Sequence, residues 1–322
     1  MTLKNRKISI LGAGNVGATI AYALTLSDIC SEIVLVDINK EKAEGEALDC
    51  AQCRACVPSK TIRCGEYKDV KGSDVIVVTF GIGRKPGQSR LDLAKVNVGI
   101  LRSVIGEVAK IEPNAIYVIV SNPVDVLTYE TIKSTGLPVN QIIGTGTLLD
   151  SNRLNEAIAN YCKVDVSNVN SVVLGEHGDA CIAPFSLATV FGYPLIDYCK
   201  KFLGYKEEEI EENLKEIYKN MVLSGAKIIK AKGATFYAIG ASTVQLIKAI
   251  FSDSHVVMPL STLVNGEYGA KDMCMGVPCV IGANGVERIL ELPLTEKEEK
   301  EFKECIERFN QTYDALEVRK ER

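Results

Sequence analysis

The opening segment constrains the fold more than any other part of this chain. A short apolar strand is predicted at 8–11, and the glycine-rich turn Gly12-Ala13-Gly14-Asn15-Val16-Gly17 follows it directly. Residues 18–27 have helical composition, and a second apolar strand at 33–36 ends at Asp37. Continuous apolar strands that alternate with helices indicate parallel βαβ units covered on both faces. The chain therefore begins with an α/β fold.

The three glycines of this G-x-G-x-x-G turn have separate tasks. Gly12 permits the tight turn, Gly14 lets a pyrophosphate approach the backbone, and Gly17 lets helix and sheet pack closely. The helix N-terminus then faces the phosphates. Asp37 lies 20 residues after Gly17, where a carboxylate accepts hydrogen bonds from ribose hydroxyls and repels a 2′-phosphate. The pattern predicts an NAD site, and the alternative is a turn that serves packing alone.

The later pattern indicates two domains. Further strands are predicted at 75–79, 117–121 and 141–144, with helical stretches such as 95–111 between them, so residues 1–145 read as a Rossmann-type doubly wound parallel sheet. From about Asp150 the pattern changes. A mixed α+β substrate domain is predicted over 146–322, with helices at 151–161, 206–230 and 296–316 and strands at 169–174, 256–264 and 277–282.

Composition excludes several classes of protein. A chain of 322 residues with 47% hydrophobic and 24% charged residues is typical of a soluble globular protein. The net charge of −4 gives no electrostatic reason to expect nucleic acid or an anionic membrane as partner. No basic and apolar leader opens the sequence, and no apolar run approaches the roughly 20 residues that cross a bilayer. We expect a cytoplasmic protein.

The eleven cysteines raise the question of a metal. Cys50, Cys53 and Cys56 have the spacing C-x2-C-x2-C, and Cys64 follows, which resembles part of a zinc or iron–sulfur motif. Residues 44–56, however, have the composition of a helix, where three thiols along one stripe cannot surround an ion. Free cysteine also behaves as a small hydrophobic residue. We expect reduced packing thiols and no metal.

Histidine is scarce, and this makes acid–base chemistry easy to place. The chain contains two histidines, His177 in Gly-Glu-His-Gly-Asp and His255 in a polar turn. Histidine is the side chain that titrates near neutral pH without perturbation. A carboxylate such as Asp150 beside one ring nitrogen would fix the tautomer and raise the pKa of the imidazole. Arg153, three residues after Asp150, shares its helical face and could hold a carboxylate with two hydrogen bonds. Spacing alone leaves a surface ion pair open for Arg153.

A glycine-rich basic loop follows the strand at 75–79. It reads Gly81-Ile82-Gly83-Arg84-Lys85-Pro86-Gly87-Gln88-Ser89-Arg90, and we expect a mobile loop over about 81–93. Ligands of open α/β sheets bind outside the carboxyl ends of the strands. Glycines would let such a loop close over a substrate and exclude water. Composition alone leaves a solvated basic loop as the alternative.

Together these segments resemble the lactate/malate dehydrogenase family over essentially the whole chain. The matching stretches, in family order and spacing, are Gly-Ala-Gly-Asn-Val-Gly (12–17), Arg-Lys-Pro-Gly-Gln-Ser-Arg (84–90), Ser-Asn-Pro-Val-Asp (121–125), Leu-Asp-Ser-Asn-Arg (149–153) and Gly-Glu-His-Gly-Asp (175–179). The resemblance implies an NAD-dependent enzyme that interconverts a 2-hydroxy acid and a 2-oxo acid. It also implies a homotetramer or a homodimer.

The resemblance assigns roles to single residues. It implies His177 as proton donor and acceptor, with Asp150 as its carboxylate partner. It implies that Arg153 anchors the substrate carboxylate, that Arg90 polarises the reacting carbonyl, and that Asn122 orients substrate and nicotinamide. Thr235 matches a position that faces the pocket, and Arg84 matches the contact to the variable end of the substrate. The predicted NAD-binding residues are Gly12, Gly14, Asn15, Val16, Gly17, Asp37, Gly81 and Asn122.

The residues that bear on the choice of substrate resemble two different branches of the family. The segments around Glu176, Thr235 and 265–269 resemble lactate-type members. Arg84, however, stands where lactate-type members resemble one another in having glutamine and malate-type members have arginine. A closed loop would bury Arg84 against the methyl group of pyruvate as an unpaired cation, at a cost of several kcal/mol, whereas oxaloacetate brings a second carboxylate that pairs with it. We therefore favour oxaloacetate and malate, and pyruvate and lactate are the alternative. A non-catalytic NAD-binding protein is disfavoured, because every motif that would carry chemistry is intact.

Overall fold

The computed structural model describes residues 5–83, 90–316 and 318–319. Its first half is a parallel sheet in which the strands follow the order β3–β2–β1–β4–β5–β6. This order is that of dinucleotide-binding folds, where ligands bind at the point at which the strand order reverses. The strands are β1 (Lys7–Leu11), β2 (Glu32–Val36), β3 (Thr61–Cys64), β4 (Val75–Val78), β5 (Ile116–Ile119) and β6 (Ile142–Gly144).

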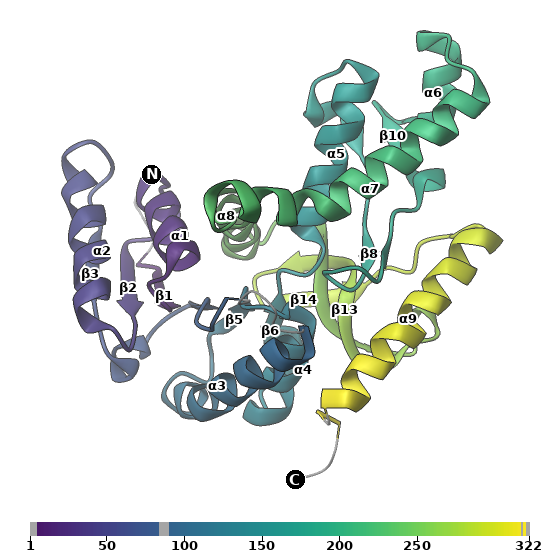
Figure 1. The fold of residues 1–322 in the computed structure, drawn as a ribbon. Helices are drawn as coiled ribbons and strands as arrows, with labels where there is room; N and C mark the ends of the chain where they lie inside the picture. The colour runs from purple at the N-terminus through teal and green to yellow at the C-terminus, as the bar shows by residue number, and fades with distance from the viewer. Residues whose placement is uncertain (1–4, 84–89, 317, 320–322) are drawn as a thin grey trace.

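Helices cover both faces of this sheet. α3 (Arg90–Ile111) and α4 (Val124–Thr135) lie side by side below it in Figure 1, and α1 (Asn15–Leu26) packs against α8 (Tyr237–Ser252) above it. α2 (Lys40–Gln52) lies beside β3. Every residue of β4 and β5 is buried, because a parallel strand covered on both faces has no solvated side. This is why these strands are continuous apolar runs in the sequence.

The sheet continues into the second half of the chain through an antiparallel pair. Ser261 of β12 pairs with Gly144 of β6, and β13 pairs with β12, β14 and β8. These strands are β8 (Leu174–Gly175), β9 (Cys181–Ile182), β12 (Val256–Asn265), β13 (Lys271–Gly282) and β14 (Gly285–Ile289). The terminal helix α9 (Glu296–Leu316) packs against β8 and β9. One large core therefore runs through both halves.

A smaller core forms where α5 (Leu148–Cys162) and α7 (Glu207–Lys232) cross, at the top right of Figure 1. A small antiparallel sheet lies beside them, made of β7 (Val169–Asn170), β10 (Thr189–Val190) and β11 (Tyr193–Pro194). The remaining elements are α6 (Leu195–Tyr198), the π-helix η6 (Cys199–Leu203) and the 3₁₀ turns η1 (Cys53–Ala55), η2 (Tyr67–Val70), η3 (Val139–Gln141), η4 (Val166–Asn168), η5 (Phe185–Leu187) and η7 (Glu267–Gly269).

The predicted fold class is confirmed, but several boundaries are wrong. α5 begins at Leu148, so Asp150 lies inside its first turn and not before the helix. The loop expected over 81–93 ends earlier, because α3 already begins at Arg90 with Asp92 in its first turn, where an acidic residue favours a helix N-terminus. The strand expected over 169–174 is two short pieces in different sheets. The sequence analysis did not identify β3, α4 or α8.

The helix expected over 44–56 is also wrong at its end. α2 stops at Gln52, and a 3₁₀ turn continues to Ala55. Pro58 follows closely, and a proline disfavours helical geometry in the residue before it. Cys53 and Cys56 therefore lie outside the α-helix. The predicted division at 145/146 falls between β6 and α5 and stays a prediction. Among the described helices, none combines the length and apolar character needed to span a bilayer.

Candidate active site

The structure brings Asp150 and His177 together across 27 residues of sequence. Asp150 projects from the first turn of α5, and His177 lies in the turn between β8 and β9. Nδ1 of His177 lies 2.5 Å from Oδ2 of Asp150. This contact assigns the proton on Nδ1 to the bond with the carboxylate and leaves Nε2 as the second ring nitrogen for a reacting group. The pair has the geometry of an oriented general acid–base.

Burial and charge oppose each other at this pair. Burial lowers the pKa of His177, but the charge and the hydrogen bond of Asp150 outweigh it, and the pKa of His177 lies above its ordinary value. Burial raises the pKa of the Asp150 carboxyl, but His177 and Arg153 lower it by more, and its pKa lies below the ordinary value. Asp150 is thus ionised at neutral pH, and His177 gains and loses its proton beside a fixed negative charge.

Arg153 shares the carboxylate of Asp150. Its Nη1 donates to Oδ1 of Asp150 at 3.1 Å, so one carboxylate orients both the imidazole and the guanidinium. Both side chains are largely buried. A carbon added at Gly225 of α7 would lie 3.9 Å from Nη2 of Arg153, so α7 borders the other side of the guanidinium. The ion pair is therefore not a surface pair, which was the alternative that spacing left open.

The glycine turn between β1 and α1 has the geometry that a pyrophosphate requires. Gly12 has φ +110°, a conformation that favours glycine. A carbon added at Gly17 would lie 1.9 Å from the carbonyl oxygen of Gly12, whereas a carbon added at Gly14 would meet no atom within 4 Å. Gly17 thus packs against the turn, and Gly14 leaves open space at the N-terminus of α1. Asn15 and Val16 form the first turn of that helix, whose free N–H groups favour an anion.

Asp37 lies beside this turn at the end of β2. Its Oδ2 accepts a hydrogen bond from the backbone N–H of Ala13 at 2.6 Å, and its Oδ1 accepts one from Asn39 at 2.8 Å. A cavity of about 420 Å³ opens at this point, with Ile38, Gly65 and Tyr67 also in its wall. An apolar side chain, an aromatic ring and a carboxylate beside a glycine turn fit the adenosine half of NAD.

Asn97 connects two predicted site segments and was missed by the sequence analysis. This buried side chain of α3 accepts from the N–H of Ile82 at 2.9 Å and donates to the carbonyl oxygens of Ile82 and Asn122. A carbon added at Gly81 would lie 3.2 Å from its Oδ1. The base of the predicted loop and Asn122 are therefore held by one amide. The signal was available, because Asn97 interrupts the apolar stripe formed by Ala94, Val98 and Leu101.

Asp125 is a second residue that the sequence analysis missed. Its Oδ2 accepts a hydrogen bond from the backbone N–H of His177 at 2.8 Å, across 52 residues of sequence. Its signal was a charged residue inside the apolar run Val124-Asp125-Val126-Leu127. A buried acid in such a run requires a donor, and here the donor is the backbone that carries the candidate acid–base.

Three predicted residues are less closely tied to this pair. Thr235 is half-buried in the connection between α7 and α8, and its role stays a prediction. Arg84 lies outside the described residues, as does the side chain of Arg90.

A cavity of about 630 Å³ opens at the amino ends of the parallel strands, next to Arg6, Asp74 and Gln141. It lies at the opposite edge of the sheet from Asp37 and Asn122 and is not part of this site.

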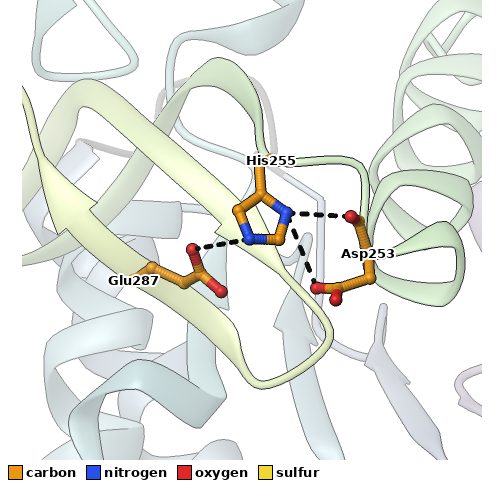
Figure 2. Close-up of side chains that lie close together, drawn as sticks. All are labelled: Asp253, His255 and Glu287. Carbon is orange, nitrogen blue, oxygen red and sulfur yellow. Dashed lines mark hydrogen bonds and ion pairs between the residues drawn. The ribbon is translucent and has the colours of Figure 1, made fainter.

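The second histidine has a different environment. Figure 2 shows the His255 ring between Asp253 and Glu287. Nδ1 donates to the carbonyl oxygen of Asp253 at 2.8 Å, and Nε2 lies 3.5 Å from Glu287. The hydrogen bond to that carbonyl raises the pKa of His255, as do the two carboxylates. The ring is 55% exposed, against 24% for His177. These contacts place His255 among exposed carboxylates at the surface, so the more buried His177 is the candidate acid–base.

The cysteines are spread over the molecule. Cys50 is buried, Cys53 is half-buried and Cys56 is exposed. Within the described residues, the side chains with metal-ligand spacing are Asp253, His255 and Glu287, and the cysteines are not among them. The expectation that this protein holds no metal stays a prediction.

Comparison with known proteins identifies the family. Residues 6–144 match the family model described as lactate/malate dehydrogenase, NAD binding domain, and residues 147–317 match lactate/malate dehydrogenase, alpha/beta C-terminal domain. The chain is 40% identical to L-lactate dehydrogenase 1 of Clostridium acetobutylicum, over 97% of this chain and 99% of that protein. It is 43% identical to an L-lactate dehydrogenase of Clostridium botulinum, over 95% of each chain.

Solved structures give the same answer. A minor L-lactate dehydrogenase from Enterococcus mundtii superposes with a TM-score of 0.92 at 38% identity, over 99% of each chain. A malate dehydrogenase from Cryptosporidium parvum superposes with a TM-score of 0.91 at 33% identity, over 97% of this chain and 99% of that one. The chain therefore belongs to the lactate/malate dehydrogenase family, as an enzyme whose cofactor is NAD.

Proposed function

We propose that this enzyme catalyses reversible hydride transfer between NADH and a 2-oxo acid, with oxaloacetate and L-malate as its preferred pair. The observation that carries the chemistry is the shared carboxylate of Asp150, which lies 2.5 Å from Nδ1 of His177 and 3.1 Å from Nη1 of Arg153. One side chain thus orients a proton donor and an anion-binding group toward the same region. The cofactor supplies or accepts the hydride.

Side chains of this protein transfer the hydroxyl proton and bind the carboxylate of the substrate. In the direction of 2-oxo-acid reduction, protonated His177 donates its Nε2 proton to the oxygen that becomes the hydroxyl group, and in the reverse direction Nε2 accepts it. Ionised Asp150 stabilises the imidazolium and holds the ring. Arg153 binds the substrate carboxylate with the edge of its guanidinium that Asp150 does not occupy. Arg90 is assigned to the reacting carbonyl by resemblance.

Arg84 supports the choice of oxaloacetate. A guanidinium enclosed with a substrate requires an anion, which the second carboxylate of oxaloacetate supplies and the methyl group of pyruvate does not. The second candidate is L-lactate dehydrogenase. It is favoured by the Clostridium relatives, which carry that name at 40% and 43% identity, whereas the malate dehydrogenase from Cryptosporidium parvum is 33% identical.

The test is the ratio of kcat/KM for oxaloacetate to that for pyruvate, measured with NADH in the wild type, in Arg84→Gln and in Arg54→Gln. We expect the wild type to prefer oxaloacetate and Arg84→Gln to lower the ratio by about 100-fold or more, because the site loses the partner of the second carboxylate. Arg54 is a surface arginine of η1, so Arg54→Gln should leave the ratio unchanged. A wild type that prefers pyruvate, with little change in Arg84→Gln, would establish lactate dehydrogenase instead.

A further inference from the structure

Asp125 is a fully buried acid that the mechanism above does not use. It is the second residue of α4, and 2% of its surface is exposed. Charged groups are almost never buried to this degree unless they are paired. Among the described residues, the hydrogen bond of good geometry to its carboxyl group is the 2.8 Å contact from the His177 N–H to Oδ2. The acid thus contacts the main chain of the candidate acid–base, and its charge also acts on the ring of that residue.

The other carboxyl oxygen of Asp125 lies near a serine hydroxyl. Within the described residues, Oδ1 of Asp125 and the hydroxyl of Ser261 in β12 are both buried without a hydrogen bond of good geometry. Ser261 is nevertheless close enough to act on the pKa of Asp125. A protonated carboxyl group could donate from Oδ1 to that hydroxyl, and an ionised one could accept a hydrogen bond from it, which is the effect by which Ser261 lowers the pKa of Asp125. The surroundings therefore accommodate both states of this acid.

Groups from every neighbouring element face this carboxyl. Besides Ser261, they are Glu176 and His177 of the β8–β9 turn, Cys274 of β13, and Cys305 and Tyr313 of α9. Burial raises the pKa of Asp125 to about 7, against the opposing effects of Ser261 and of the amide and charge of His177. The thiols of Cys274 and Cys305 and the hydroxyl of Tyr313 have raised pKa values and stay neutral there.

We propose that Asp125 is a positioning residue for His177. Its carboxyl group holds the backbone N–H of His177, and its negative charge, the second beside this residue after that of Asp150, favours protonation of the imidazole ring. The inference rests on the proposed role of His177 in proton transfer. Asp150 orients the ring from the side of Nδ1, and Asp125 holds the main chain of the same residue. Because the charge of each group shifts the pKa of the other, protonation of Asp125 and protonation of His177 are coupled.

The experiment uses the fact that the chain has two histidines. Protein labelled with ¹³C-histidine gives two ring signals, and His255→Gln identifies the one from His177. The ring is titrated from pH 5 to 9 in the wild type, in Asp125→Asn and in Glu130→Gln. Asparagine keeps an acceptor for the His177 N–H and adds a donor for Ser261. Glu130→Gln is the matched control, because Glu130 is a buried acid of the same helix that pairs with Arg102.

We expect the pKa of His177 to fall by about one unit in Asp125→Asn, because a nearby opposite charge is removed, and to stay unchanged in Glu130→Gln. The wild-type curve should contain a second step near pH 7 that Asp125→Asn lacks. The fall of kcat/KM for the 2-oxo acid at high pH should move to lower pH in Asp125→Asn and recover on acidification, which a merely structural defect would not do.

A folded Asp125→Asn protein with an unchanged His177 titration would overturn the inference. If that variant fails to fold, the wild-type curve decides, because a single-step titration would show that no second group is coupled to the ring. The proposed function fails on different results, such as full turnover in His177→Asn. The ring titration needs no substrate, so the two failures are distinguishable.

Discussion

Among single residues, Asp150 bears on both chemical groups of the site, since it contacts the imidazole of His177 and the guanidinium of Arg153. Asp150→Asn removes the charge that keeps the pKa of His177 raised. We expect kcat for 2-oxo-acid reduction at neutral pH to fall about 100- to 10,000-fold, the usual range for general acid–base catalysis. KM should rise, because Arg153 loses its orienting partner. Steady-state kinetics from pH 5 to 9 measures both effects.

The pH dependence has a defined sign. Reduction requires protonated His177, so wild-type kcat/KM is retained below the raised pKa of His177 and falls as the pH rises through it. In Asp150→Asn the fall should begin at lower pH. Asp253→Asn is the matched control, since it removes the carboxylate beside the other histidine and should leave the kinetic profile unchanged. Equal profiles for wild type and Asp150→Asn would exclude the Asp150–His177 pair as the acid–base.

At the scale of an element, the β1–α1 turn separates folding from cofactor binding. Gly17→Ala places a carbon 1.9 Å from the Gly12 carbonyl oxygen, and we expect a loss of about 1–3 kcal/mol in the free energy of unfolding from overpacking. Gly14→Ala meets no protein atom within 4 Å, so its stability should change by less than about 1 kcal/mol. Its Kd for NADH should nevertheless rise about 10-fold or more, because the added methyl group occupies the approach of the pyrophosphate.

Thermal unfolding followed by circular dichroism and titration of NADH fluorescence distinguish the two variants. Gly72→Ala is unsuitable as a control, because Gly72 has φ +78°, whereas Gly45 in α2 has open space around its Cβ position and ordinary helical geometry. Gly45→Ala should bind NADH like the wild type. Wild-type affinity in Gly14→Ala would place the pyrophosphate elsewhere.

Helices and strands were easier to predict from the sequence than the residues at which they begin and end. β4 and β5 are buried on both faces, and this imposes continuous apolar runs that are visible in the sequence. The run over 169–174 is also apolar, yet β7 pairs with β10 and β8 pairs with β13. A local pattern records burial and does not record which sheet provides the partner. The single strand predicted there was wrong for this reason.

For the molecule as a whole, the packing of the eleven cysteines is a test of the complete fold. Eight are buried, Cys53 and Cys64 are half-buried, and Cys56 is exposed. Burial raises the pKa of several of the buried thiols, among them Cys30 and Cys305, each to about 11, so they are both inaccessible and protonated. We expect at most three thiols of the native protein to react rapidly with a disulfide reagent, and all eleven after denaturation.

Mass spectrometry of the modified protein should place the fastest reaction at Cys56, and Cys56→Ser should remove it. Rapid modification of Cys274 or Cys279, both buried in β13, would contradict the packing described here. Metal analysis of the same preparation tests the expectation that the Cys50–Cys56 segment holds no ion.

The sequence by itself determined the Rossmann-type half, the NAD site and the identity of the acid–base candidate. These depend on local patterns, such as glycines in one turn, an acid at the end of the next strand and a scarce histidine. The resemblance already implied Asp150 as a partner of that histidine, and only the tertiary structure decided the geometry of this contact and the second partner, Asp125. Asp150 and Asp125 reach His177 across 27 and 52 residues, and Asn97 reaches Asn122 across 25. Contacts of this kind depend on where the chain returns after crossing the core, which no local run of residues specifies.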